Sequence, residues 1–269
     1  MGKFERLFEL NKFLFRIFGF LLSVRRIRLL WKNKKSLRKN AEIKSLKNSK
    51  KCFVIGLGPS LKKIDLKKLD GDLIVTNRFN KVEGSKNIKP VAYVLLDNFF
   101  YNGKYKDDLL GAINDFSDSF FVLNGAYRDN IDSSVLANVK HAFIYCWKGF
   151  LNGKKDNLDL AKLLPIMNNV ACAAEVVALY MGYEEICLLG CDFNSFASLK
   201  KEHVYKEKNE ERLWSMSNEL FQYAFAADLH HQLDIYSRRR GQRIYNLTEG
   251  SLIDAYERKN CDQYKNENT

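Results

Sequence analysis

The sequence predicts an α/β protein, in which a doubly wound, mostly parallel, Rossmann-like sheet follows an N-terminal basic amphipathic helix. From residue 51 onward, short apolar runs alternate with amphipathic stretches, as in parallel strands joined by helices. Glycine-rich or polar turns follow several of these runs, as at the carboxyl ends of strands in such sheets. The first 50 residues are strongly basic and periodically apolar, which indicates a helix of different character.

The apolar runs that predict strands are short and bounded by polar residues or glycine. They are Phe53–Ile55, Leu73–Thr76, Val91–Leu96, Phe120–Leu123, Ala142–Cys146, Glu185–Gly190 and Arg243–Asn246. Apolar residues at helical spacing predict helices over Tyr105–Asn114, Asn168–Met181 and Glu210–Arg239. Gly182 follows the second of these helices, where a C-terminal cap is expected.

Composition and charge divide the chain into three parts. With 269 residues, 46% of them hydrophobic, and three prolines, the chain is long enough for one large domain with appendages. Residues 1–51 hold 16 Lys and Arg against three acids, so the rest of the chain carries −1 of the total charge of +12. We therefore expect a basic arm over 1–50, a globular domain over 51–259 and a polar tail over 260–269.

The basic arm has the pattern of a helix that lies in the surface of an anionic membrane. Apolar residues recur at helical spacing from Phe4 to Leu22, and basic residues crowd the segment from Arg25 to Lys39. The longest uncharged run, Ile17 to Val24, is shorter than the roughly 20 residues that a membrane-spanning helix needs, and no signal-peptide cleavage site follows it. We expect residues 3–39 to bind the inner face of a membrane from the cytoplasm.

Two alternatives for the arm stay open, namely packing on the protein's own core or on a second subunit. Nucleic acid is not an expected partner, because no aromatic-studded recognition module accompanies the charge. The six cysteines form no C-x-x-C pair, which favours buried thiols in a reducing compartment over a metal site. Asp70-Gly71-Asp72 precedes a strand and lies at the wrong end of it for a nucleotide pocket, so we interpret it as a turn.

The turn after the first strand, Gly56-Leu57-Gly58-Pro59-Ser60-Leu61, has the composition of a phosphate-binding turn. Glycines let the backbone approach an oxyanion closely, and Ser60 can cap the following helix while offering a hydroxyl. Leu61 replaces the third glycine of a dinucleotide turn, and no Gly-Lys-Ser/Thr follows as in a P-loop. A plain Gly-Pro turn is the alternative.

Each of four predicted strands ends in a polar side chain. These are Ser60, Asn77, Asp97 and Asp192. Because the carboxyl ends of parallel strands meet at one edge of a sheet, the four should converge there. Such convergence is the geometry of a nucleotide pocket.

Three stretches together resemble a known enzyme family. They are the turn Gly56 to Leu61, the segment Thr76-Asn77-Arg78-Phe79, and Met181-Gly182-Tyr183-Glu184-Glu185-Ile186 followed by Gly190-Cys191-Asp192-Phe193. In this order they are similar to the bacterial sialyltransferases of glycosyltransferase family 42, and to the wider MptE-like group that includes pterin pyrophosphokinases and flagellin-glycosylation factors. The likeness covers roughly Lys51 to Arg258 and leaves the basic arm outside.

The family-42 resemblance implies a GT-A-like variant of the sheet and an inverting glycosyltransferase that uses no metal or other cofactor. It implies transfer of sialic acid, or a related nonulosonic acid, from a CMP-sugar to a cell-surface glycan. The donor would then lie over Gly56, Gly58 and Ser60, with Asn77 on the nucleotide. Further donor contacts would come from Asp97, Asn169, Asp192, Asn194 and Ser195, with Asn169 at a helix N-terminus that faces the phosphate or carboxylate.

In this family a histidine removes the proton of the acceptor hydroxyl, and His203 is our candidate because it follows the Asp192 strand end in a polar loop. The alternative is an exposed loop histidine without a role. The family's two phosphate-binding tyrosines are replaced here by Asn194-Ser195-Phe196. We therefore expect Tyr205 to donate one hydroxyl to the leaving phosphate, and Ser195 or Asn194 to supply the other contact.

Two other functions compete with this interpretation. In an MptE-like pyrophosphokinase that uses ATP and Mg²⁺, Asp97 and Asp192 would face the metal. In a non-catalytic glycosylation factor only the fold would be kept. The expected partners under the first interpretation are a CMP-sugar, a glycan acceptor and the membrane, and a homo-oligomer is possible.

Overall fold

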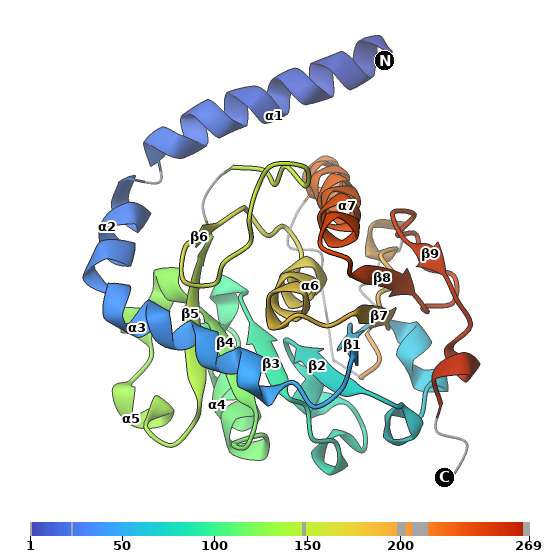
Figure 1. Cartoon of the computed structure of the whole chain (residues 1–269). Helices are drawn as coiled ribbons and strands as arrows, with labels where there is room; N and C mark the ends of the chain where they lie inside the picture. The colour runs from blue at the N-terminus through green and yellow to red at the C-terminus, as the bar shows by residue number, and fades with distance from the viewer. Residues whose placement is uncertain (1, 23, 147–148, 198–202, 206–214, 266–269) are drawn as a thin grey trace.

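A computed structural model describes residues 2–22, 24–146, 149–197, 203–205 and 215–265 (Figure 1). Within these residues, nine strands form one sheet in the order β6-β5-β4-β3-β2-β1-β7-β8-β9, and every neighbouring pair is parallel. The strands are β1 (Lys51–Ile55), β2 (Asp72–Thr76), β3 (Ala92–Leu95), β4 (Phe120–Asn124), β5 (His141–Cys146), β6 (Leu163–Leu164), β7 (Glu185–Leu189), β8 (Arg243–Asn246) and β9 (Glu257–Arg258). The predicted doubly wound parallel sheet is confirmed.

The α-helices are α1 (Lys3–Leu22), α2 (Val24–Lys32), α3 (Lys34–Arg38), α4 (Lys106–Asp115), α5 (Ser133–Leu136), α6 (Val170–Met181) and α7 (Met216–Arg239). Of these, α6 and α4 cover opposite faces of the sheet. Short 3-10 helices join them, among them η1 (Lys39–Leu46), η2 (Pro59–Lys63), η6 (Asn98–Phe100) and η9 (Cys261–Tyr264). Residues 210–214 of the predicted long helix lie outside the described residues.

The core has two layers because side chains alternate across each strand. Val54, Ile74 and Val94 lie on the face that α6 covers, while Ile55 and Val75 lie on the opposite face, which α4 covers. Helix α6 lies across the middle of the sheet (Figure 1). It ends at Gly182, which has a positive φ of 83° and donates its amide to the carbonyls of two residues of the last turn, as predicted for a C-terminal cap.

Strands β6 and β9 are the two edge strands, and neither was predicted. Each has only two residues, which is too short for a hydrophobic period to be recognised. They join the sheet because a neighbouring strand offers free backbone groups at its edge.

The globular body begins before the expected boundary at residue 51. Asn40 is buried, and its side-chain amide donates to the carbonyls of Phe143 at 2.9 Å and Leu160 at 2.8 Å. Leu37 and Ile43 are buried beside it. The last part of the expected arm therefore belongs to the core, because it closes the side of the sheet near β5.

The first helix is present as predicted, and it lies along the outside of the body near α7 (Figure 1). Phe8 stacks on Phe225 of α7 with ring centroids 5.4 Å apart, and Lys12 Nζ lies 2.8 Å from Asp228 Oδ1. Among the described residues, no helix combines the length and the hydropathy needed to cross a membrane.

The expected polar tail differs from the structure as far as residue 265. Cys261 and Tyr264 are buried, and Lys265 forms an antiparallel bridge with Leu69. The Tyr264 ring meets the Phe53 ring edge-on at 6.1 Å. Two apolar side chains in a polar stretch thus hold this segment on the body.

Candidate functional site

A cavity of about 310 Å³ opens where the sheet order reverses. Successive strands run from β1 toward β6 on one side, and β7 lies against β1 on the other. The chain leaves β1 toward β2 and leaves β7 toward β8, in opposite directions, and open α/β sheets bind ligands at the carboxyl ends of strands where the order reverses in this way. The walls of the cavity come from the ends of β1, β2, β3 and β7, the N-terminus of α6, and residues 203–205.

The two glycines of the first turn allow the loops after β1 and β7 to touch. The Gly56 amide donates to the Leu189 carbonyl, and the Gly58 amide donates to the Gly190 carbonyl, both at 2.8 Å. A Cβ on Gly56 would lie 2.4 Å from the Gly190 carbonyl oxygen. The glycines line the cavity as predicted, but their amides are already bonded to the β7 loop, so the turn serves as a floor and not as a phosphate cradle.

Ser60 and Asp192 bind each other across this floor. The Ser60 hydroxyl donates to Asp192 Oδ2 at 2.7 Å, and its amide donates to Oδ1 at 3.2 Å. The carboxylate thus takes the place at the turn that we expected for a ligand oxyanion. Asp192 lines the cavity, whereas Ser60 lies outside its wall.

Asn77 stands at the end of β2 in a left-handed backbone conformation with φ of 47°, which asparagine tolerates better than most residues. Its backbone carbonyl accepts from the Tyr93 hydroxyl at 2.8 Å, and its amide donates to the Val94 carbonyl. Its side-chain Oδ1 is buried and finds no hydrogen-bond partner among the described residues. A buried acceptor at a cavity wall is suited to a donor group on a ligand.

The N-terminus of α6 faces the cavity through Asn169, Val170 and Ala171. Asn169 caps the helix, since its Oδ1 accepts from the Ala171 amide at 2.7 Å. The first amides and the dipole of a 12-residue helix favour an anion at this point. Asn169 therefore caps a helix N-terminus that lines the cavity, and the resemblance predicts that this N-terminus faces a phosphate or carboxylate of the donor.

Asp97, Asn194 and Ser195 also line the cavity. Asp97 caps η6, because its Oδ1 accepts from the Phe99 amide at 3.0 Å. Ser195 Oγ contacts the hydroxyl of Tyr223, which comes from α7. A second cavity of about 500 Å³ adjoins the first and shares Asp97 and Ser195 with it.

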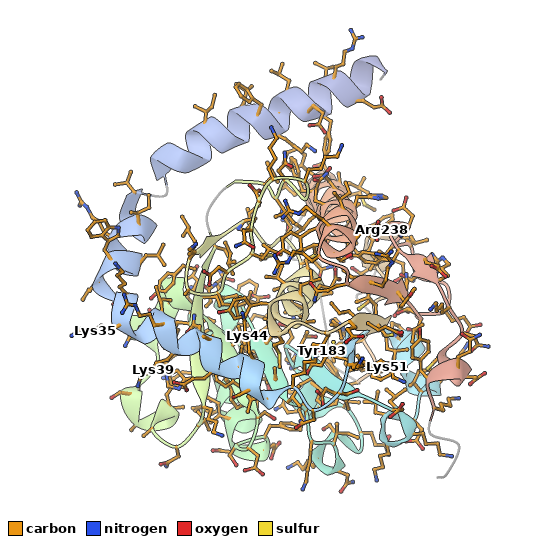
Figure 2. All side chains as sticks on the ribbon, in the orientation of Figure 1. Lys35, Lys39, Lys44, Lys51, Tyr183 and Arg238 are labelled. Atoms are coloured by element: carbon orange, nitrogen blue, oxygen red, sulfur yellow. The ribbon has the colours of Figure 1, made fainter. Side chains whose placement is uncertain are left out.

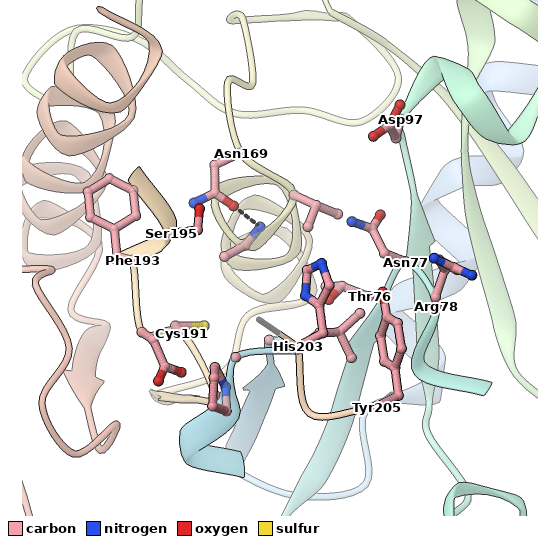
Figure 3. A pocket seen from close by; sticks show the side chains of 18 of the residues that line it. Thr76, Asn77, Arg78, Asp97, Asn169, Cys191, Phe193, Ser195, His203 and Tyr205 are labelled. Atoms are coloured by element: carbon pink, nitrogen blue, oxygen red, sulfur yellow. Dashed lines mark hydrogen bonds between the residues drawn. The ribbon is translucent and has the colours of Figure 1, made fainter. Parts of the chain in front are cut away.

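His203 and Tyr205 both project into the cavity (Figure 3). Their rings stack with centroids 5.0 Å apart and planes inclined by 13°. The Val204 amide between them donates to the Leu57 carbonyl at 2.9 Å, which ties this segment to the first turn. The predicted base thus lies over the predicted donor floor.

The lining residues that were not predicted include Arg78, Lys104, Tyr105 and Tyr223. Arg78 follows Asn77 in the segment Thr76-Asn77-Arg78-Phe79, so its place next to a predicted site residue could have identified it. Tyr223 had no such signal, because it lies two residues from both Phe221 and Phe225, on the other side of the helix, and no motif marks that side. Its ring lies 4.6 Å from the Phe193 ring, which makes it part of the wall.

The buried cluster of Cys172, Glu175 and His230 has the residue types of a metal site. Cys172 Sγ lies 3.7 Å from His230 Nδ1 and 3.5 Å from Nε2. One ligand atom from each of the three side chains lies within 4.8 Å of the others, so their spacing by itself is compatible with a metal ion. Glu175 pairs with His230 Nδ1 at 3.1 Å and accepts from the Tyr256 hydroxyl at 2.5 Å.

The remaining candidates for chemistry have structural partners. Burial raises the pKa of the Cys191 thiol, so this cavity-lining cysteine stays protonated and is a poor nucleophile. Asp72 accepts from the Tyr183 hydroxyl and the Asn48 amide, both at 2.7 Å, and Asp70 pairs with Lys51. The Asp70-Gly71-Asp72 stretch is therefore a structural turn at the opposite end of the strand from the cavity.

No protein-family model matches the sequence, and no curated protein sequence does. Among solved structures, the fold is similar to the sialyltransferase CstII from Campylobacter jejuni in complex with cytidine-5'-monophosphate, at 16% identity and a TM-score of 0.48 over 81% of this chain and 87% of that one. It is also similar to the monofunctional α-2,3-sialyltransferase Cst-I from the same organism, at 17% identity and a TM-score of 0.47 over 82% and 84%. At these values the likeness concerns the path of the backbone and decides nothing about the chemistry.

Proposed function

We propose that this protein is an inverting glycosyltransferase that moves sialic acid, or a related nonulosonic acid, from a CMP-sugar to a glycan acceptor. One observation carries the proposal: the cavity at the β1/β7 reversal brings together a helix N-terminus, the His203 imidazole and Asn77 Oδ1, which has no hydrogen-bond partner among the described residues. The helix N-terminus can bind an anion, Asn77 Oδ1 can accept from an amine or hydroxyl of the nucleotide, and His203 can act as the base. The sequence resemblance supplies the identity of the donor.

A CMP-linked nonulosonic acid carries two anionic groups, a phosphate and a carboxylate. The N-terminus of α6 can receive one of them. Lys104 adds positive charge to the opposite wall, whereas the charge of Arg78 there is already paired with Asp108. The α6 N-terminus and Lys104 can therefore receive the two anions, whereas Asp97 and Asp192 add negative charge to the same cavity.

In the proposed reaction, His203 takes the proton of the acceptor hydroxyl. The oxygen of that hydroxyl forms a bond to the anomeric carbon of the donor sugar. The bond from that carbon to the phosphate oxygen breaks, and its electron pair leaves with CMP. Hydroxyls of Tyr205 and Tyr223, with Ser195, stabilise the charge that grows on the leaving phosphate. Tyr223 thereby takes one of the two tyrosine positions that the sequence left empty.

We further propose that α1 lies on the surface of an anionic membrane. Leu7, Leu10, Phe13, Leu14 and Ile17 are 41–59% exposed. At about 3.6 residues per turn they share one side of the helix, opposite to Phe8 and Lys12, which dock on α7. Basic residues follow on α2 and α3, and Figure 2 shows Lys35 and Lys39 on the outer edge of the molecule.

Thermal unfolding tests the donor assignment. CMP should raise the melting temperature with EDTA present, and a concentration of 100 times Kd should add about 2.7 kcal/mol of stability. Stabilisation by ATP only with Mg²⁺ would contradict the proposal and favour a pyrophosphokinase. No response to either nucleotide would also contradict it and favour an accessory factor.

A further inference from the structure

A column of stacked side chains leads from the start of α4 to His203. The guanidinium carbon of Arg78 lies 4.6 Å from the centre of the Tyr105 ring and 5.2 Å from that of the Tyr205 ring. Tyr205 in turn stacks on the imidazole of His203. Arg78 thus lies between two aromatic rings, and the second of these carries His203.

An ion pair anchors the column to the body. Arg78 Nε lies 2.7 Å from Asp108 Oδ2, and these side chains are only 6% and 13% exposed. Lys81 Nζ contacts the other oxygen of Asp108 at 2.8 Å. Because Asp108 belongs to α4 and Arg78 follows β2, the guanidinium is held by two elements of the fold. Charged pairs with little access to water keep one geometry better than exposed pairs do.

The column acts on the short segment of residues 203–205, which one backbone hydrogen bond among the described residues ties to the body, from the Val204 amide to the Leu57 carbonyl. Tyr205 and His203 flank this bond. Stacking engages the face of the imidazole, whereas its nitrogens lie at the edge. A ring held in this way keeps its orientation and can still take a proton.

We propose that Arg78, supported by Tyr105 and Asp108, is a positioning residue that holds His203 in the cavity through the Tyr205 ring. The inference rests on the proposed function only where it treats His203 as the base. Cation–π contacts with Arg have a preferred geometry as well as an energy, so Lys cannot replace Arg78 in the column.

Hydrogen exchange of the folded protein tests the column without any assay of activity. In Arg78→Gln, exchange of the Val204 amide, followed by mass spectrometry of the peptides that contain it, should rise by about tenfold or more, while strand β4 keeps its protection. Arg128→Gln is the matched control, since that guanidinium lies 5.3 Å from the Phe143 ring and away from the cavity. Unchanged exchange at Val204 would overturn the proposal.

Two further variants keep the test decisive. Arg78→Gln could fail to fold because Asp108 loses its ion pair with Arg78. In that case the double variant Arg78→Gln with Asp108→Asn removes both charges of the pair and should show the same loss of protection at Val204. Tyr205→Phe keeps the ring and should exchange like the wild type. Loss of Val204 protection in Tyr205→Phe would show that the hydroxyl and not the ring holds the segment, and would overturn the column.

Kinetics then separates positioning from general stability. In Arg78→Gln we expect kcat to fall about 10- to 100-fold, because a displaced base loses its near-attack geometry, while KM for the CMP-sugar changes less than about threefold. An unchanged kcat would overturn the proposal. Failure of the wild type to transfer any sugar would instead contradict the proposed function, and the exchange result at Val204 would still decide whether the column exists.

Discussion

At the scale of single residues, the floor of the cavity depends on glycines, because a Cβ atom at these positions would collide with the neighbouring loop. Gly56 and Gly190 bring two loop backbones together, and a Cβ on Gly58 would lie 1.9 Å from Asp192 Oδ2. The Asp192 carboxylate then fixes Ser60 by two hydrogen bonds. The polar groups of the floor are therefore mostly used to join β1 to β7, and we propose that Asn77, the α6 N-terminus and the 203–205 segment make the ligand contacts.

Gly56→Ala should lower the free energy of unfolding by at least about 2 kcal/mol, because its Cβ would meet the Gly190 carbonyl, which is backbone and cannot rotate away. Denaturant unfolding measures the change. Gly111→Ala is the matched control, since it lies within α4, meets only the Asn80 side chain at 3.2 Å, and gains helix propensity. Equal stability of the two variants would contradict the close approach.

His203→Ala should reduce sugar transfer by about 100-fold or more and leave CMP binding unchanged, since a general base contributes about 10²–10⁴ to the rate. Initial rates and a CMP titration measure the two effects. His231→Ala serves as the control, because His231 is half exposed on α7, pairs with Asp254 at 3.1 Å and lies outside the cavity wall. A fully active His203→Ala enzyme would refute the assignment.

At the scale of elements, two helices point their ends or faces toward possible ligands. Helix α6 is buried along most of its length and directs its N-terminus into the cavity. Helix α1 is docked by one side only, and its other side is apolar and exposed. The hydrophobic period of each helix could be found in the sequence, because helix periodicity depends on neighbours along the chain.

The exposed face of α1 gives the membrane test. Replacing Leu10, Phe13 and Ile17 together by Gln should weaken binding to anionic lipid vesicles at least about tenfold, because each apolar side chain buried in the interface adds to the affinity. Vesicle co-sedimentation measures this loss. Phe8→Ala with Lys12→Ala changes the docked face instead and should leave vesicle binding intact. Vesicle binding that survives the triple change would contradict the proposal. If the triple change abolishes an oligomer and leaves vesicle binding intact, the exposed face of α1 binds a second subunit.

At the scale of the whole molecule, we propose that the boundary between arm and body lies near residue 33, because the Asn33 side chain donates to the Tyr145 hydroxyl and buried residues follow from Leu37 onward. Removal of residues 2–32 should leave the free energy of unfolding within about 2 kcal/mol of the wild type. Removal of residues 2–44 should cost about 3 kcal/mol or more, because it deletes Leu37, Asn40 and Ile43 from the core. Thermal unfolding distinguishes the two, and equal melting temperatures would place the boundary after residue 44.

The sequence by itself determined the parallel sheet, the succession of its main strands along the chain, the basic first helix and the position of Asn77, Asp97 and Asp192 at one edge. All of these follow from local periodicity and from the rule that parallel strands end at the same edge. Only the tertiary structure decided that the amides of Gly56 and Gly58 bond to the β7 loop, that Asp192 binds Ser60, and that Arg78 and Tyr223 line the cavity. These contacts join residues more than 100 positions apart, or on different elements, and no pattern along the chain records such proximity.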